Sequence, residues 1–272
     1  MKKRLFGAVL AIASLGLVLG GCGSDQQATS SDTIKVGVNL ELSGANASYG
    51  QSTAEGLELG IEQVNNAGGI NGKKVQIVKY DNKSEAAEAT TLGTKLMAQD
   101  NVLAVMGPAT SGAFKAQIPV GIQNKIPVIS SSATAEDVTV DDSGVKEYAF
   151  RICYTDSYQG TALAKFALKN LSMTKAAILM DNSNDYSKGL DKSFNEAFTE
   201  GGGTIVAKEA YVGGETDFNA VLTKIKDKGF QTLFIAGYYQ EAGLIIKQAR
   251  ALGIDVPILG ADGFESPKLV EL

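Results

Sequence analysis

Hydroxyl-bearing and small residues gather in six short segments, and these are the residues whose types could do chemistry in this chain. Serine, threonine and tyrosine hydroxyls can donate hydrogen bonds to an anion, and an aspartate carboxylate can accept them from a cation. Basic side chains are few in these segments, with Lys188 as the main exception. The segments are ELSGANASYG (41–50), GPATSGA (107–113), SSSATAED (130–137), DNSNDYSKG (181–189), GYYQEAG (237–243) and GADGFESP (260–267).

Nucleophilic and phosphate-binding chemistry fit these segments poorly. Histidine is absent from the sequence, which excludes a Ser-His or Cys-His pair and an imidazole zinc site, so Ser111 has no base to activate it. The glycines at 44 and 50 are separated by five residues and followed by Gln51, so they do not form a Walker loop. A nucleophile elbow and the Rossmann glycine pattern are also missing. Tight turns that hold no ligand remain an alternative reading of any single segment.

Carboxylate catalysis is an open alternative at Asp81, Asp181 or Asp262. General acid–base catalysis of this kind needs two carboxylates at a defined separation. No spacing in the sequence pairs two of these three. We interpret Asp81 and Asp181 as residues that hold loops at strand ends.

Composition sets the broad class of the protein. The chain has 272 residues, 44% of them hydrophobic, which is enough for one large domain or two modest lobes. Its 25 basic and 30 acidic residues give a net charge of −5. No basic patch is dense enough to predict nucleic-acid binding.

The N-terminus is typical of an export signal. A basic start, an apolar run from Leu5 to Leu19 and the small residues before Cys22 predict a signal peptide over residues 1–21. The LGGC sequence resembles a bacterial lipobox, so Cys22 is expected to carry lipid and residues 22–32 to form a flexible tether. An ordinary signal peptide or an uncleaved anchor are the alternatives. Cys153 then lacks a partner and is expected to be buried as a small apolar group.

The remaining sequence alternates short β-branched runs with amphipathic segments, which predicts α/β lobes with parallel sheets covered on both faces. The first lobe is expected over residues 33–149 and the second over 150–272, joined by a hinge near Phe150–Thr155. Pro119 is expected to bend or shorten the helix that contains it. The predicted strands are Ile34–Leu40, Val75–Tyr80, Val102–Met106, Pro127–Ile129, Ala176–Met180, Thr204–Tyr211, Thr232–Ala236 and Pro257–Gly260.

All six segments follow predicted strands. Ligands of open α/β sheets bind beyond the carboxyl ends of the strands, so the segments are expected at the edge where a ligand binds. As a set they favour a ligand site over six unrelated turns.

At this point a family resemblance becomes specific. The stretch from LELSGANASYGQ through YDNKSE, followed in order by VMGPATSGA, PVISSSAT, FRICYTDSYQG, DNSNDYSKG and GADG, resembles the branched-chain amino acid binding proteins of ABC importers. These are the leucine/isoleucine/valine type of periplasmic binding protein. The resemblance covers residues 34–272. It implies two doubly wound lobes that close on an amino acid about a hinge.

The resemblance implies which residues hold the ligand carboxylate. Ser111 and Thr134 would donate hydroxyl and backbone hydrogen bonds to it. Ser132 and Ala133 would supply backbone contacts from the same loop. Donors at this end suit the negative pole of a zwitterion.

The resemblance also implies the rest of the pocket. Tyr49 would line it from the first lobe, while Tyr186 and Tyr238 would close over the ligand from the second. Asp262 would accept the ligand ammonium group. Many relatives have glutamate at this position, and the shorter aspartate would shift the ammonium or admit a water. A turn residue satisfying local donors is the alternative role for Asp262.

Relatives continue beyond the position of Leu272, so the first lobe is expected to be incomplete at the C-terminus. The leading functional hypothesis is an extracytoplasmic, lipid-anchored solute-binding protein that delivers an amino acid to an ABC permease and its ATPase. An extracytoplasmic sensor domain that reports a ligand to a membrane receptor is the alternative. Neither hypothesis involves catalysis, a cofactor, a metal or nucleic acid.

Overall fold

The computed structural model describes residues Thr33–Leu272. These residues form two parallel β-sheets covered by helices. The predicted signal peptide (1–21), lipidated Cys22 and tether (22–32) lie outside these residues. We call the elements around the first sheet the first lobe and those around the second sheet the second lobe. The division predicted between residues 149 and 150 stays a prediction.

The first lobe contains a five-stranded sheet with the order β2-β1-β3-β4-β7. All of its neighbouring strands pair in parallel. A short antiparallel pair, β5–β6, lies in the irregular stretch before β7. The elements are β1 (Thr33–Leu40), α1 (Ala47–Asn66), β2 (Lys74–Asp81), α2 (Ala86–Ala98), β3 (Val105–Met106), α3 (Ser111–Asn124), β4 (Val128–Ser130), η1 (Glu136–Val138), β5 (Val140–Asp141), β6 (Gly144–Val145) and β7 (Ala149–Arg151).

The second lobe contains a four-stranded parallel sheet with the order β11-β10-β8-β9. Its elements are α4 (Asp156–Lys165), η2 (Phe166–Asn170), β8 (Lys175–Asp181), α5 (Asp185–Glu200), β9 (Thr204–Tyr211), α6 (Asn219–Ile225), β10 (Thr232–Ala236), α7 (Tyr239–Ala251), β11 (Ile258–Leu259), η3 (Asp262–Phe264) and η4 (Pro267–Val270).

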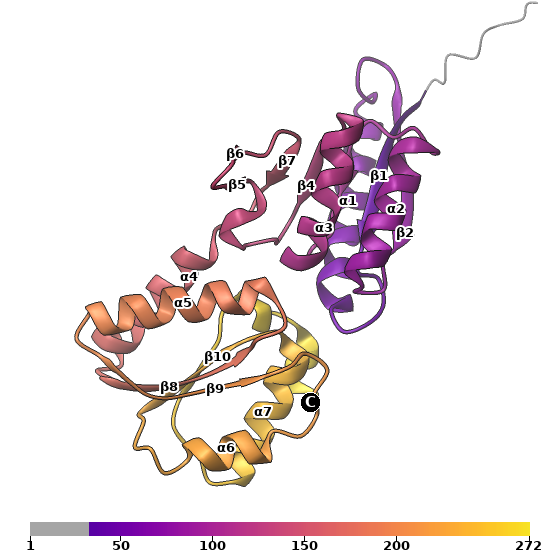
Figure 1. The fold of residues 1–272 in the computed structure, drawn as a ribbon. Helices are drawn as coiled ribbons and strands as arrows, with labels where there is room; N and C mark the ends of the chain where they lie inside the picture. Colours follow the sequence, from indigo (N-terminus) through magenta and orange to yellow (C-terminus); the bar gives the residue numbers. More distant parts are fainter. Residues whose placement is uncertain (1–32) are drawn as a thin grey trace, which may run out of the picture. The chain divides into compact units, whose positions relative to one another are not determined.

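Both sheets are doubly wound, which confirms the predicted fold class. Strand order reverses at β1 in the first sheet and at β8 in the second. Because crossovers between parallel strands are right-handed, such a reversal places successive helices on opposite faces. In the second lobe α4 and α5 pack together on one face, and α6 and α7 cover the other (Figure 1). In the first lobe α2 packs against α3.

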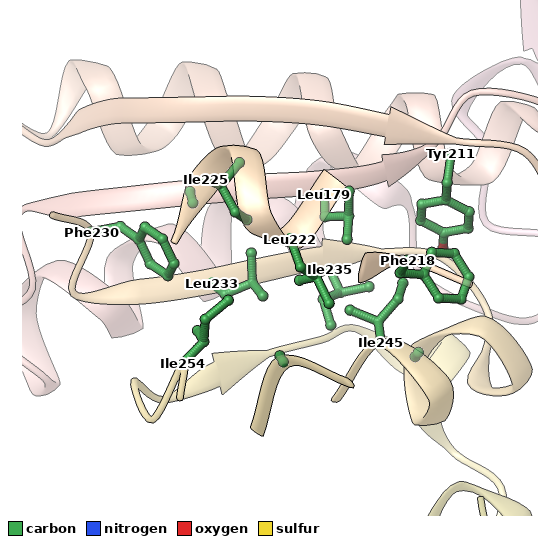
Figure 2. Packing of buried hydrophobic residues seen from close by; sticks show 13 residues of the cluster. Leu179, Tyr211, Phe218, Leu222, Ile225, Phe230, Leu233, Ile235, Ile245 and Ile254 are labelled. Atoms are coloured by element: carbon green, nitrogen blue, oxygen red, sulfur yellow. The ribbon is translucent and has the colours of Figure 1, made fainter. Parts of the chain in front are cut away.

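The central strands are apolar because both of their faces are covered. Every residue of β8 after Lys175 is buried, as is every residue of β10. Below these strands, Leu222 and Ile225 of α6 pack with Ile245 of α7, while Phe218 meets the Tyr211 ring edge-on at 5.3 Å (Figure 2). This core holds the sheet whose strand ends carry the second-lobe loops.

The predicted strands differ from the observed ones mainly in length. Thr204–Tyr211 and Thr232–Ala236 are confirmed residue for residue, whereas β3 covers only Val105–Met106. The helix containing Pro119 is not shortened and runs from Ser111 to Asn124. Strand β7, which pairs with β4, and helix α4 are among the elements that were not predicted.

Within Thr33–Leu272, no helix has the length and apolar composition needed to cross a bilayer.

Replacing Phe218 by alanine is expected to lower the free energy of unfolding by about 3–5 kcal/mol, because it leaves a cavity under the second sheet. Leu59→Ala is the control, since Leu59 is 57% exposed and should cost little. Urea unfolding of both variants measures the difference. A loss below about 1 kcal/mol for Phe218→Ala would contradict the packing described above.

Candidate functional site

A cavity of about 460 Å³ is framed by loops at the carboxyl ends of the strands of both lobes. Its volume falls within the roughly 300–1,000 Å³ of small-molecule sites. No basic side chain is among the described residues that line it. These are Ser48, Tyr49, Ser52, Thr53, Ala109, Thr110, Ser131, Ser132, Ile152, Cys153, Tyr154, Tyr186, Tyr238, Asp262, Gly263 and Glu265.

Tyrosine rings form one apolar wall of the cavity. Tyr186 and Tyr238 are stacked with their ring centroids 4.9 Å apart. Tyr49 of the first lobe lies 5.8 Å from Tyr238 and 5.4 Å from Tyr239. The structure therefore brings together the three tyrosines that the sequence predicted, one from the first lobe and two from the second.

Asp262 places a carboxylate in the cavity. The Tyr186 hydroxyl donates to its Oδ1 at 2.7 Å, and Gln159 accepts from its backbone N–H at 3.0 Å. Burial raises the pKa of Asp262 above its ordinary value, and the Tyr186 hydroxyl offsets part of that rise. One carboxylate oxygen is thus held by the protein, and the group still faces the cavity.

Several hydroxyl groups around the cavity donate their proton to an oxygen atom of the protein. Tyr49 donates to the Gly263 carbonyl, Ser132 to the Ala109 carbonyl at 3.0 Å, and Thr110 to Glu41 at 2.8 Å. Carbonyl and carboxylate oxygens cannot donate, so in each pair the hydroxyl is the donor. The hydroxyls of Tyr49, Ser132 and Thr110 can therefore offer a ligand only an acceptor, and the Tyr186 oxygen already accepts the Gly263 N–H at 2.8 Å.

Other hydroxyl protons stay available to a ligand. The hydroxyls of Tyr238 and Ser52 have no hydrogen-bond partner within residues 33–272. Thr53 and Ser131 share one bond at 3.0 Å in which either oxygen can be the donor. These hydroxyls can donate hydrogen bonds to the negative end of a ligand. No basic side chain is among the described lining residues to bind that end.

Only one of the four residues predicted to hold a ligand carboxylate lines the cavity. Ser132 lines the cavity, whereas Ser111, Ala133 and Thr134 do not. Ser111 is buried, and its oxygen accepts a hydrogen bond from the Ala135 N–H at 3.1 Å. The predicted ligand roles of these four residues stay predictions, and for the three buried ones the structure shows contacts to the protein.

Two residues that sequence reasoning missed hold the loops of the cavity wall. Glu41 accepts hydrogen bonds from the backbone of Ala109 and Thr110. Arg151 donates to the carbonyl of Ala135 at 2.8 Å and to that of Thr134 at 3.1 Å. An acidic or basic residue next to a strand gives no sign of such a partner when the partner lies 68 or more positions away, as for Glu41.

The interpretation of Asp81 and Asp181 as loop-holding residues is confirmed. Asp81 accepts hydrogen bonds from the N–H groups of Leu42, Ser43 and Lys83. Asp181 accepts the N–H of Gly213 at 3.1 Å, together with bonds from the loop that directly follows it. Neither carboxylate lines the cavity.

Cys153 differs from its predicted setting. It is half-buried and lines the cavity instead of filling a core. Burial raises the pKa of its thiol to about 11, so the thiol is protonated at neutral pH.

Asp156 is a second buried carboxyl group near the site. It is fully buried, and neither of its oxygens has a hydrogen-bond partner within the described residues. Burial, together with the charges of Asp262 and Glu136, raises its pKa to about 7. Asp156 is therefore a polar group that the fold leaves poorly satisfied.

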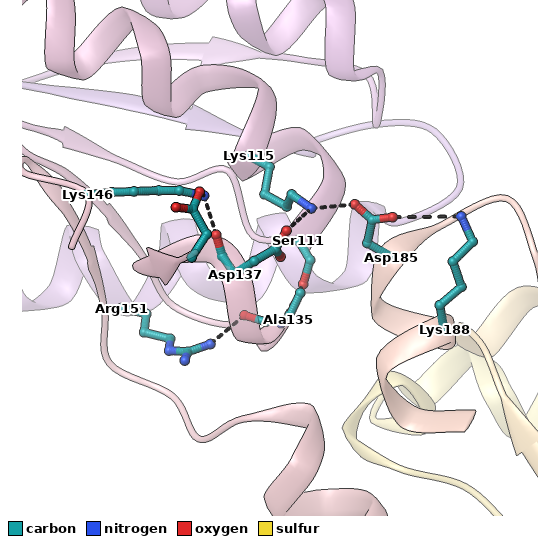
Figure 3. Close-up of polar contacts among 9 residues, drawn as sticks. Ser111, Lys115, Ala135, Asp137, Lys146, Arg151, Asp185 and Lys188 are labelled. Atoms are coloured by element: carbon teal, nitrogen blue, oxygen red, sulfur yellow. Dashed lines mark hydrogen bonds and ion pairs between the residues drawn. The ribbon is translucent and has the colours of Figure 1, made fainter. Parts of the chain in front are cut away.

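A four-membered charge network joins the two lobes away from the cavity (Figure 3). Lys115 of α3 contacts Asp137 at 2.5 Å and Asp185 of α5 at 2.6 Å. Asp185 also lies 3.7 Å from Lys188. The Lys115 ammonium holds the pKa of Asp185 below its ordinary value. The network is partly exposed, so it is expected to contribute little to stability.

Residues 33–272 contain no cluster of three or more cysteine, aspartate or glutamate side chains that could hold a metal ion. Two doubly wound lobes, with a cavity of acceptors and tyrosines at their strand ends, define a two-lobed ligand-binding protein.

Residues 33–269 match the family model described as Periplasmic binding protein, and the chain belongs to that family. This confirms the resemblance found in the sequence. A Leu/Ile/Val-binding protein homolog from Brucella melitensis is 31% identical over 233 residues, which cover 86% of this chain and 62% of the relative. The chain therefore matches less than two thirds of that relative's length.

Two solved structures are similar to this chain. LivJ, the branched-chain amino acid transporter substrate binding protein of Streptococcus pneumoniae, solved in complex with isoleucine, is 44% identical with a TM-score of 0.83. The match covers 88% of this chain and 67% of LivJ. The leucine binding protein LivK of Thermotoga maritima is 33% identical with a TM-score of 0.82, covering 88% of this chain and 66% of LivK.

Asp156→Asn is expected to flatten the pH dependence of stability. The pKa of Asp156 is raised to about 7 in the folded state, so the folded state binds its proton more tightly than the unfolded state. Stability should therefore fall as pH rises from about 4 to about 7, by on the order of 2–4 kcal/mol. Urea unfolding of both proteins between these pH values measures the effect. An identical pH dependence in the variant would show that Asp156 titrates normally.

Removing the Lys115–Asp185 contact is expected to cost less than about 1 kcal/mol, because both side chains reach solvent. A double-mutant cycle with Lys115→Met and Asp185→Asn isolates the coupling from other effects of each change. The coupling should disappear at about 1 M salt, where exposed charges are screened within roughly 3 Å. A coupling energy that is unchanged by salt would indicate that the two side chains are much less exposed to solvent than in the structure.

Proposed function

We propose that this protein is the extracytoplasmic solute-binding component of an ABC importer and that it binds a branched-chain amino acid in the cavity. The observation that carries the proposal is the chemistry of the cavity wall. A carboxylate, hydroxyls that donate to acceptors of the protein, and tyrosine rings line a space of about 460 Å³, and no basic side chain is among the described lining residues. Lining residues of this kind suit a ligand that carries an ammonium group next to an apolar side chain.

Each pole of an amino acid has a counterpart in the wall. Asp262 would accept the ammonium group through the oxygen that Tyr186 does not occupy. The hydroxyls of Ser52, Ser131 and Tyr238 would donate to the carboxylate. Ser111, Ala133 and Thr134 are buried and do not line the cavity, so in this proposal they support its wall.

The aliphatic side chain of the ligand would lie against the tyrosine rings. Tyr49, Tyr186 and Tyr238 are within stacking distance of one another and present ring faces and edges. Ala109 and Ile152 add apolar surface. LivJ, which is 44% identical to this chain, was solved with isoleucine, and this supports a branched aliphatic ligand.

Binding needs no catalysis. Hydrogen bonds to charged groups contribute roughly 1.5–3 kcal/mol each, and burial of a leucine-sized side chain contributes a similar amount. Three or four such contributions, reduced by the cost of immobilising the ligand, reach the roughly −8 kcal/mol of micromolar affinity. The family consists of binding proteins, which agrees with this role.

Family membership indicates an extracytoplasmic location. We further propose that lipid on Cys22 attaches the protein to the membrane, where the loaded lobes would meet the permease and its ATPase. The lipobox-like LGGC sequence and the polar residues after it support this attachment. Contacts from α1 to the second lobe, such as Tyr49 to the Gly263 carbonyl and Ser48 to Ser266 at 2.7 Å, would hold the lobes together around a ligand.

Calorimetric titration of the protein with leucine, isoleucine and valine is expected to show micromolar binding. Asp262→Asn should weaken that binding by about 1–3 kcal/mol, because the ligand ammonium loses an ionised acceptor. Affinity for the unmodified protein should also fall as pH drops through the raised pKa of Asp262, since protonation removes the same charge.

Asp227→Asn is the matched control, because Asp227 is exposed and does not line the cavity. Its affinity should equal that of the unmodified protein. Absence of heat with every amino acid would refute the proposed function, whereas unchanged affinity in Asp262→Asn would show that the ammonium binds elsewhere.

A further inference from the structure

Lys115 of α3 is the residue through which the charge network reaches from one lobe to the other (Figure 3). Its Nζ donates to Asp137 Oδ2 within the first lobe at 2.5 Å and to Asp185 Oδ2 of α5 at 2.6 Å. Of the ion pairs within residues 33–272, only Lys115–Asp185 connects the two lobes. We call this contact the interlobe ion pair. The Lys115 side chain is 25% exposed, less than either carboxylate.

The two helices joined by the interlobe ion pair both begin at the cavity. Thr110, the residue before α3, lines the cavity, and Lys115 lies in the second turn of that helix. Asp185 is the first residue of α5 and directly precedes Tyr186, which also lines the cavity. The interlobe ion pair therefore fixes the start of α5, and with it Tyr186, relative to the first lobe.

Tyr186 connects the start of α5 with the cavity wall of the second lobe. Its side chain is buried, its hydroxyl donates to Asp262 Oδ1 at 2.7 Å, and the same oxygen accepts the Gly263 N–H at 2.8 Å. Its ring is stacked on that of Tyr238. A shift of α5 would thus move a residue that contacts both the carboxylate and an aromatic ring of the wall.

The lobes are also connected at a second place, through α1. Tyr49 donates to the Gly263 carbonyl, and the hydroxyl oxygens of Ser48 and Ser266 lie 2.7 Å apart. These contacts reach the segment after β11, whereas the interlobe ion pair reaches α5. Two different first-lobe helices therefore hold the second lobe, and separation of the lobes requires both connections to break.

The neighbouring charges favour the interlobe ion pair. Lys115 contacts Oδ2 of Asp185, and Lys188 of the same helix lies 3.7 Å from Oδ1. The hydrogen bond from Lys115 and the charges of both lysines hold the pKa of Asp185 below its ordinary value, so this carboxyl group is ionised at neutral pH. The network contains two lysines and two aspartates. Loss of the Lys115 charge would leave one negative charge uncompensated between α3 and α5.

We propose that Lys115 is a positioning residue of the ligand site, which holds α5 against the first lobe through Asp185 and so slows the release of a bound amino acid. The proposal rests on the proposed function and assigns the interlobe ion pair a role in how long the ligand stays bound. Lys115 itself does not line the cavity. Its contact with Asp137 stays within the first lobe and provides an internal comparison.

Stopped-flow measurement of tyrosine fluorescence gives the rates of leucine association and release, since the chain has nine tyrosines and no tryptophan, and several of the tyrosines line the cavity. Lys115→Met and Asp185→Asn each remove the interlobe ion pair. Asp137→Asn removes only the contact within the first lobe, and Lys115→Arg keeps the cation. Lys125→Met changes an exposed lysine at the end of α3 and is the matched control for net charge.

Lys115→Met and Asp185→Asn are each expected to speed leucine release about two- to fivefold, the range for a partly exposed ion pair, and to change the association rate less than about twofold. The double variant should release leucine no faster than the faster single variant, because both changes remove the same contact. Lys115→Arg, Asp137→Asn and Lys125→Met should release leucine like the unmodified protein. At about 1 M salt the difference between Lys115→Met and the unmodified protein should disappear.

Two results would overturn the proposal. The first is an unchanged release rate in Lys115→Met. The second is an equal acceleration in Asp137→Asn and Asp185→Asn, because a purely structural role of Lys115 inside the first lobe requires only its contact with Asp137.

Small-angle X-ray scattering separates this proposal from the proposed function. If the unmodified protein binds no amino acid, the proposed function fails, and the role in ligand release fails with it. The connection between the lobes is then decided on the unliganded protein, whose radius of gyration should be larger in Asp185→Asn than in Asp137→Asn. Equal radii in the two variants would overturn that connection as well.

Discussion

Four hydroxyl protons around the cavity are already donated to acceptors of the protein, and this constraint fixes the polarity that the site presents. Tyr49, Thr110, Ser132 and Tyr186 all donate to carbonyl or carboxylate oxygens. These four residues and Asp262 line a space without a basic side chain among its described lining residues. A cationic nitrogen is the group that such a surface binds best, and the remaining free hydroxyls are left for a carboxylate.

The fold supplies this arrangement because both sheets end at the cavity. Each sheet reverses its strand order once, and residues of α1 and of the loops after β3 and β4 line the same cavity as residues of α5 and of the segments after β10 and β11. Ligand crevices of open α/β sheets occur at such reversals. Apolar strands buried on both faces hold the loop ends in place, so buried polar groups such as Glu41 can be satisfied by donors from a neighbouring loop.

The sequence predicts the architecture better than the site. Long apolar strands such as Thr204–Tyr211 are recognisable from their own residues, whereas the three residues of β7 form a strand only because β4 lies beside them. The three tyrosines and Asp262 lie together at the cavity wall, and their predicted roles toward a ligand stay predictions. Ser111 and Thr134 resemble Thr110 and Ser132 in chemistry but do not line the cavity, so composition cannot predict which of these residues do. Glu41 could not be found because its partners, Ala109 and Thr110, are distant in sequence.

A crystal structure with isoleucine bound tests the central claim most directly. We predict the ligand in the cavity, with its ammonium nitrogen at about 3 Å from an Asp262 carboxylate oxygen and its side chain against Tyr186 and Tyr238. An isoleucine bound with its carboxylate at Asp262, or bound outside this cavity, would contradict the polarity inferred for the site.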